Sequence, residues 1–211
     1  MRRPDRLTQA ERRERTRQAL LEASAVELSR YGYGQFNLAR VASSAGFTRG
    51  ALYHQFTDKN DLILAVIEWT RDTWLREVGA LVTEERDPVA ALLVLARGQA
   101  AFSRRDVARV LIALRMSFAG QDHPVGREVE RTYALLIERC RDLVADGQGA
   151  GSITTDTPAE VLATALLGAL EGLFIGLASR AFDEQTPPTP TPYLETLAVR
   201  TVAGVLGLKG T

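Results

Sequence analysis

The residues best suited to chemistry lie close together between positions 48 and 59. Thr48 stands where the spacing predicts the start of a short helix, and the free backbone N–H groups of a helix start favour anions. Arg49 and Tyr53 are expected to project from one exposed side of that helix, within reach of bases or phosphates. Gly50 has no side chain, so another molecule could approach its backbone closely. Lys59, at the start of the next predicted helix, adds a cation, and the set favours binding of a polyanion.

Groups that serve catalysis or metal binding are sparse by comparison. The two histidines, His54 and His123, are far apart in sequence, and neither has a cysteine or carboxylate at ligand spacing. The single cysteine, Cys140, cannot form an internal disulfide and is expected to be a buried, inert thiol in a reducing, cytoplasmic setting. We find no nucleophile–base pair or phosphate loop, so we expect no enzyme, no metal and no cofactor.

Composition and charge point the same way. The chain has 211 residues, of which 45% are hydrophobic, enough for a sizeable core. Residues 1–60 contain 11 Lys and Arg against 6 Asp and Glu, a net charge of +5, and residues 61–211 contain 15 against 20, a net charge of −5. A basic N-terminal segment on an acidic body suggests contact with a polyanion. The alternative is a solvated basic helix without a partner, and charge alone does not decide between them.

Two segments bear on membrane association. Residues 1–10 are polar and basic, without the apolar stretch of a signal peptide. Residues 161–179 are long and apolar enough to span a membrane. Glu171 interrupts this run, however, and no aromatic belts flank it. We therefore expect no membrane span but a helix buried between neighbouring helices.

The elements that must position these residues are all predicted to be helical. Ala, Leu, Glu and Arg dominate, strand-forming runs are scarce, and caps or N-terminal prolines mark each start. Thr8 with Glu11 forms an expected capping box, as does Thr157 with Glu160. The Pro- and Thr-rich residues 183–190 are predicted to form an exposed loop. The nine predicted helices cover approximately residues 8–31, 38–45, 49–56, 59–84, 88–102, 106–118, 124–146, 158–182 and 192–206.

Gly46 lies between the second and third predicted helices, and two short helices joined by a tight turn form a helix-turn-helix. A helix after such a turn can enter the DNA major groove. The stretch from Gly32 to Val66 resembles the TetR family of transcriptional regulators. The matching positions are Gly32-Tyr33, Asn37, Val41-Ala42, Ala45-Gly46, Thr48 to Tyr53, Phe56, and Lys59 with Leu62.

The resemblance implies an all-α fold with a three-helix DNA-binding domain at residues 1–57 and a ligand-binding and dimerisation domain at residues 58–211. Ala42, Gly46, Leu52 and Phe56 would hold the motif together. The implied DNA-contacting set is Asn37, Thr48, Tyr53, His54 and Lys59 at phosphates, Arg49 and Gly50 with Tyr53 at base edges, and Ala51 beside them. Three residues depart from the family pattern: Phe36 replaces a usual Thr, Gln55 a usual His or aromatic residue, and Glu27 a usual Leu.

The C-terminal part supports coarser predictions. Aromatic or soft side chains are candidates for lining an apolar ligand pocket: Trp69, Trp74, Phe102, Met116, Phe118, Tyr133 and Phe174. Glycine is costly inside a helix, so its recurrence every fourth residue suggests close contact with another helix, such as that of a second copy. The predicted dimer interface comprises Gly168, Gly172, Gly176, Leu197, Thr201 and Val205.

Taken together, these features predict a homodimeric repressor that binds an inverted-repeat operator in double-stranded DNA and is released by a small, apolar or aromatic effector. Two alternatives remain open. One is a regulator of the same fold whose ligand promotes DNA binding, or that activates transcription. The other is a helical interaction protein that has lost DNA binding.

Overall fold

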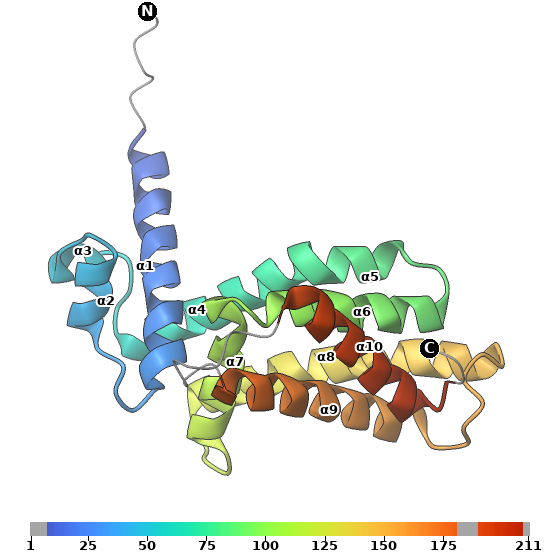
Figure 1. The fold of residues 1–211 in the computed structure, drawn as a ribbon. Helices are drawn as coiled ribbons and strands as arrows, with labels where there is room; N and C mark the ends of the chain where they lie inside the picture. Colours follow the sequence, from blue (N-terminus) through green and yellow to red (C-terminus); the bar gives the residue numbers. More distant parts are fainter. Residues whose placement is uncertain (1–7, 181–189, 209–211) are drawn as a thin grey trace, which may run out of the picture. The chain divides into compact units, whose positions relative to one another are not determined.

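The computed structural model describes residues 8–180 and 190–208, and every regular element among them is a helix (Figure 1). The all-α prediction is confirmed. The elements are α1 (Gln9–Tyr31), α2 (Leu38–Ser44), α3 (Arg49–Tyr53), α4 (Lys59–Trp74), η1 (Leu75–Gly79), α5 (Ala80–Glu84), α6 (Pro88–Phe102), α7 (Asp106–Phe118), α8 (Pro124–Gly149), α9 (Ala159–Arg180) and α10 (Thr191–Leu206).

Elements α4, η1 and α5 follow one another without a break, so they form the single helix predicted for residues 59–84. The middle segment η1 is a π-helix, in which the hydrogen bonds skip one residue more than in an α-helix. Counted this way, the described residues form nine helices, as the sequence predicted.

Side-chain caps at the helix starts explain why the predicted bounds agree so well. Thr8 and Glu11 form the expected capping box on α1. Asp58 Oδ1 accepts from Asp61 N at 2.9 Å at the start of α4, and Asp87 Oδ2 accepts from Ala90 N at 2.7 Å at the start of α6. Each cap satisfies a backbone donor that the first turn leaves unpaired.

The predicted bounds differ from the structure at the end of α8 and at the start of α9. Helix α8 continues to Gly149, past the predicted end at residue 146. The Pro158 carbonyl receives the first hydrogen bonds of α9, while Thr157 Oγ1 accepts from Thr155 Oγ1 at 3.0 Å, so the predicted cap lies one residue too early. Residues 181–189, with most of the predicted exposed loop and the predicted end of α9, lie outside the described residues.

The chain divides into two compact units. The first comprises residues up to Arg71 together with Asp106–Glu130, and the second comprises Asp72–Arg105 and the residues from Arg131 onward. In the first unit, α1 packs on α7, and Ser29 Oγ donates to Asp106 Oδ1 at 2.9 Å. These units are defined by packing. The boundary predicted between residues 57 and 58 separates a DNA-binding from a ligand-binding function, and it stays a prediction.

The core of the second unit forms where α6 packs against α10 and against the η1–α5 segment. Leu92, Leu95 and Val202 are almost fully buried there. Gly98 of α6 allows this close approach, because a Cβ atom at this position would lie only 2.8 Å from Val78 Cγ1.

Helix α9 is less buried than the sequence predicted. Residues Ala159–Gly176 are long and apolar enough to cross a membrane, and only 33% of them are buried. The prediction that neighbouring helices of the same chain enclose this segment is therefore wrong for the described chain. Val161 and Ile175 are exposed, as are Gly168, Gly172 and Gly176.

Candidate nucleic-acid interface

The turn between α2 and α3 has the geometry of a helix-turn-helix. Gly46 adopts a φ of +78°, a conformation that L side chains rarely take, and Phe47 N donates across the turn to Ala42 O at 2.8 Å. Beneath the turn, Ala42, Leu52 and Phe56 are at most 2% exposed. The structure thus confirms the predicted core of the motif.

One face of α3 is open to solvent. Thr48 caps this helix by accepting from Ala51 N at 3.2 Å, and Thr48, Arg49 and Gly50 are all exposed. Tyr53 is 44% exposed, and its hydroxyl accepts from Arg49 Nη2 at 3.0 Å. Arg49 and Tyr53 therefore project from the same side, as predicted. His54 is exposed just after this helix, and Ala51 is half-buried.

Asn37 precedes α2 and is exposed. Its Oδ1 accepts from both Ala39 N at 2.8 Å and Arg40 N at 3.2 Å, so the amide oxygen caps the helix. The cap uses the amide oxygen, and the Nδ2 group is the part of the side chain suited to donate to a phosphate.

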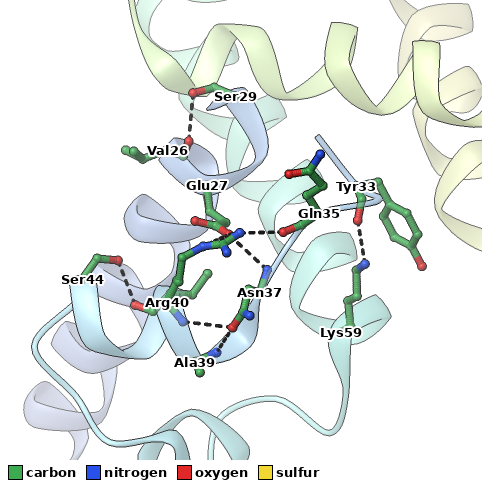
Figure 2. A network of polar contacts seen from close by, with 11 residues as sticks. Val26, Glu27, Ser29, Tyr33, Gln35, Asn37, Ala39, Arg40, Ser44 and Lys59 are labelled. Carbon is green, nitrogen blue, oxygen red and sulfur yellow. Dashed lines mark hydrogen bonds and ion pairs between the residues drawn. The ribbon is translucent and has the colours of Figure 1, made fainter. Parts of the chain in front are cut away.

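Lys59 is turned inward. Its Nζ donates to the backbone carbonyl of Tyr33 at 2.7 Å (Figure 2). The same atom lies 3.8 Å from the centre of the Tyr33 ring and 5.7 Å from that of Phe36. Desolvation lowers the pKa of this ammonium. One of its three donors is therefore committed to the protein, and its predicted phosphate contact would have to use the others.

The residues that depart from the family pattern each have a structural role. Phe36 is 7% exposed and belongs to the core. Gln55 Nε2 donates to Arg13 O at 3.3 Å, which ties the end of α3 to α1. Glu27 is 6% exposed and accepts from the Asn37 backbone N–H at 3.1 Å and from the Arg40 guanidinium (Figure 2).

Sequence reasoning missed this pairing of Glu27 with Arg40. The available signal was the position of Glu27, seven residues after Leu20 and next to Leu28, on the buried stripe of α1. A carboxylate on such a stripe requires a partner, because an unpaired buried charge is strongly unfavourable.

The seven predicted pocket residues are divided between the two compact units. Trp69, Met116 and Phe118 belong to the first unit, and Trp74, Phe102, Tyr133 and Phe174 belong to the second. Met116 is 74% exposed. Phe118 stacks on His123, with ring centres 4.3 Å apart, and meets Tyr33 edge-on. Trp74 Nε1 donates to Gln99 Oε1 at 2.7 Å. The ligand pocket therefore stays a prediction.

The predicted dimer residues lie on two helices. Gly168, Gly172 and Gly176 are exposed on α9, and a Cβ atom at any of them would meet nothing within 4 Å. On α10, Leu197, Thr201 and Val205 are half-buried. The close helix contact expected of the glycines is thus absent among the described residues of one chain, and a second chain stays a prediction.

The remaining reactive groups are engaged or buried. His123 Nδ1 accepts from Val125 N at 3.2 Å at the start of α8. Cys140 is fully buried, and burial raises the pKa of its thiol to about 12. Within residues 8–180 and 190–208, no three His, Cys, Asp or Glu side chains form a group that could hold a metal ion.

The sequence of the helix-turn-helix segment is similar to that of known regulatory proteins. The family model described as bacterial regulatory proteins, tetR family, matches residues 20–66. The HTH-type transcriptional regulator CymR of Pseudomonas putida is 44% identical over 66 residues, which cover 31% of this chain and 32% of CymR. The nucleoid occlusion factor SlmA of Escherichia fergusonii is 26% identical over 163 residues, which cover 74% of this chain and 80% of SlmA.

Solved structures share the fold over most of the chain. A TetR-family transcriptional regulator from Streptomyces coelicolor superposes with a TM-score of 0.73 at 20% identity, covering 92% of this chain and 95% of that one. The MbdR regulator from Azoarcus sp. CIB gives 0.73 at 21% identity, covering 88% and 98%. AibR, solved with isovaleryl coenzyme A and operator DNA, gives 0.67 at 17% identity, covering 87% and 96%. The helix-turn-helix segment thus matches the tetR family of bacterial regulatory proteins, and the described chain shares its fold with solved TetR-family regulators.

Proposed function

We propose that this chain is a TetR-family repressor that binds an inverted-repeat operator as a homodimer and releases it when a small molecule binds. The observation that carries the proposal is the exposed face of α3, where Thr48, Arg49, Gly50 and Tyr53 surround a buried Leu52. A guanidinium, a phenol and an accessible backbone on one face are groups that can bind bases and phosphates.

DNA reading would follow from this face. The major groove of DNA accepts an α-helix, and an arginine side chain that reaches the base edges in the groove can donate to guanine O6 and N7. Thr48 and Asn37 stand at the starts of α3 and α2, where backbone N–H groups and the helix dipole favour phosphates. His54 and the remaining donors of Lys59 would add further phosphate contacts.

Dimerisation is supported by the exposed surface of α9 and α10. Tyr193 is 63% exposed, Val161 53% and Ile175 43%, and the glycines of α9 leave room for another helix. A two-fold symmetric dimer places two recognition helices about one DNA turn apart, and this spacing requires an inverted repeat.

Release by a ligand would be a population shift, in which the ligand binds better to a state with wrongly spaced recognition helices. The continuous helix of α4, η1 and α5 begins next to the helix-turn-helix and ends in the second unit, and π segments often mark functional positions in helices. AibR was solved with a small molecule and operator DNA together, which supports an effector for this chain, and we expect an apolar or aromatic one. Its work on DNA would be in the cytoplasm.

The test is selection of bound duplexes from a randomised pool, followed by retesting of the winners across salt concentrations. We expect an inverted-repeat winner whose affinity falls steeply with salt and is lost in Tyr53→Ala. If the folded, dimeric protein enriches no motif, the proposed function is wrong and an interaction protein without DNA binding takes its place. Operator binding with and without candidate ligands then separates a repressor from a ligand-activated binder.

A further inference from the structure

Glu27 acts on two parts of α2 at once. Its Oε1 accepts from Asn37 N at 3.1 Å and from Nε of Arg40 at 2.8 Å, with a second bond from Nη2 of the same guanidinium (Figure 2). In an ordinary capping box, the third helical residue supplies the carboxylate that receives the N-cap N–H. Arg40 stands at this third position, so the carboxylate comes from α1 instead.

Arg40 is held from several sides. Besides the two bonds to Glu27, its Nη2 donates to Gln35 O at 2.6 Å, and the guanidinium carbon lies 4.6 Å from the centre of the Tyr31 ring. The side chain is nevertheless 48% exposed, whereas that of Glu27 is 8% exposed. Arg40 is thus a cation at the surface whose direction is set by a buried carboxylate.

The position of Arg40 makes this direction important. Asn37, three residues earlier, is expected to contact a DNA phosphate, and residues three apart lie on the same side of a helix, about one turn or 5 Å from each other. A released arginine there could reach the same phosphate backbone. Such a contact strengthens binding to every sequence and carries no base information.

We propose that Glu27 is a specificity-determining residue that withholds Arg40 from the DNA backbone and positions Asn37 to contact it. The inference rests on the proposed DNA-binding function. An apolar side chain at position 27 would also fill the buried stripe of α1, but it would leave Asn37 N–H and Arg40 without this acceptor. The carboxylate therefore lowers sequence-independent affinity while keeping the contact that sets the register.

The test uses the full chain and a fluorescent duplex of arbitrary sequence, about two helical turns long. Anisotropy titrations across salt concentrations give the slope of log K against log salt. Glu27→Gln removes the charge that holds Arg40, so each subunit should gain one phosphate contact and its slope should steepen by about 0.9. The ratio of affinities at about 50 and 200 mM salt would then rise about 3.5-fold per subunit.

Two further variants separate this role from simple support of the fold. Arg40→Met added to Glu27→Gln should return the slope to that of the wild type. The double variant Glu27→Leu/Arg40→Met, which replaces the pair by apolar side chains, should keep the wild-type slope even if Glu27→Gln does not fold. Melting temperatures identify the folded variants.

Several outcomes would overturn the proposal. In a purely structural role, Glu27→Gln would melt earlier but show the wild-type slope. If Arg40 already contacts phosphate in the wild type, Glu27→Leu/Arg40→Met would have a shallower slope. Failure of the wild type itself to bind any duplex at low salt would refute the proposed function, and this inference with it, a result distinct from the other two.

Discussion

Substitutions of Asn37 test the predicted DNA contact, because two different atoms of its side chain are expected to cap α2 and to contact a phosphate. Its Oδ1 caps α2 through Ala39 N and Arg40 N, and its Nδ2 is the candidate phosphate donor. Asn37→Asp keeps an oxygen for the cap and exchanges the donor for a negative oxygen. Asn37→Ala removes both functions and serves as the matched control.

The expected magnitudes differ clearly. Loss of an N-cap costs about 1 kcal/mol, so Asn37→Ala should lower the melting temperature by about 2–4 °C for a chain of this size. In Asn37→Asp the helix dipole favours the added charge and nearby Glu27 opposes it, and each effect is at most about 1 kcal/mol. This variant should therefore melt close to the wild type.

DNA binding should follow a different order. A hydrogen bond to a charged phosphate contributes about 1.5–3 kcal/mol, which corresponds to roughly 10- to 150-fold in affinity per subunit. Asn37→Ala should lose about this much, and Asn37→Asp at least as much, because its carboxylate repels the phosphate. Calorimetry and anisotropy on one duplex at fixed salt measure both quantities.

Either of two results would refute this reasoning. Wild-type affinity in Asn37→Asp would mean that Nδ2 does not touch phosphate. A wild-type melting temperature in Asn37→Ala would mean that the cap does not stabilise α2 measurably, and the hydrogen bonds of Figure 2 would then be worth little at this position.

The remaining predictions concern packing and reactivity. Leu52→Ala should cost about 2–5 kcal/mol of stability because Leu52 is fully buried. Tyr53→Ala should weaken DNA binding without lowering the melting temperature by more than a few degrees. Equal losses of stability in the two variants would contradict the assignment of a buried and an exposed face to α3. Gly98→Ala should destabilise the protein by about 1–3 kcal/mol because its methyl group would clash with Val78, and the better helix propensity of alanine should offset about 1 kcal/mol of this loss. In thermal denaturation, adding Val78→Ala should recover part of the lost stability. Additive losses in the double variant would argue against the contact. The Cys140 thiol, with its pKa raised to about 12, should resist alkylation at pH 8 in the folded protein and react in denaturant, so rapid labelling of the native chain would refute its burial. Because only the unfolded thiol ionises near its ordinary pKa of 9.0, stability should fall as pH rises above that value, and Cys140→Ala should lack this component in pH-dependent melting.

Much of the helical framework was predictable because its signals are local. The cap at Asn37, the positive φ at Gly46 and the burial of Leu52 beside an exposed Tyr53 depend on residues within a turn or two of one another. Hydrophobic periodicity and capping act on the same short scale, so bounds and exposed faces can be read along the chain. The predicted end of α8 at residue 146 is too early, because the helix continues through Gly147 and ends at Gly149.

Tertiary structure decided the features that join distant residues. Lys59 turns onto Tyr33, Phe118 stacks on His123, and Glu27 receives Arg40 from a different helix. No local pattern specifies such partners, because the energy of a buried charge or an aromatic pair depends on what the fold brings within a few ångströms. The sequence by itself thus determined which helices form and which face of α3 is exposed. The fold decided which of the predicted contact residues are free to reach DNA and which are held by the protein.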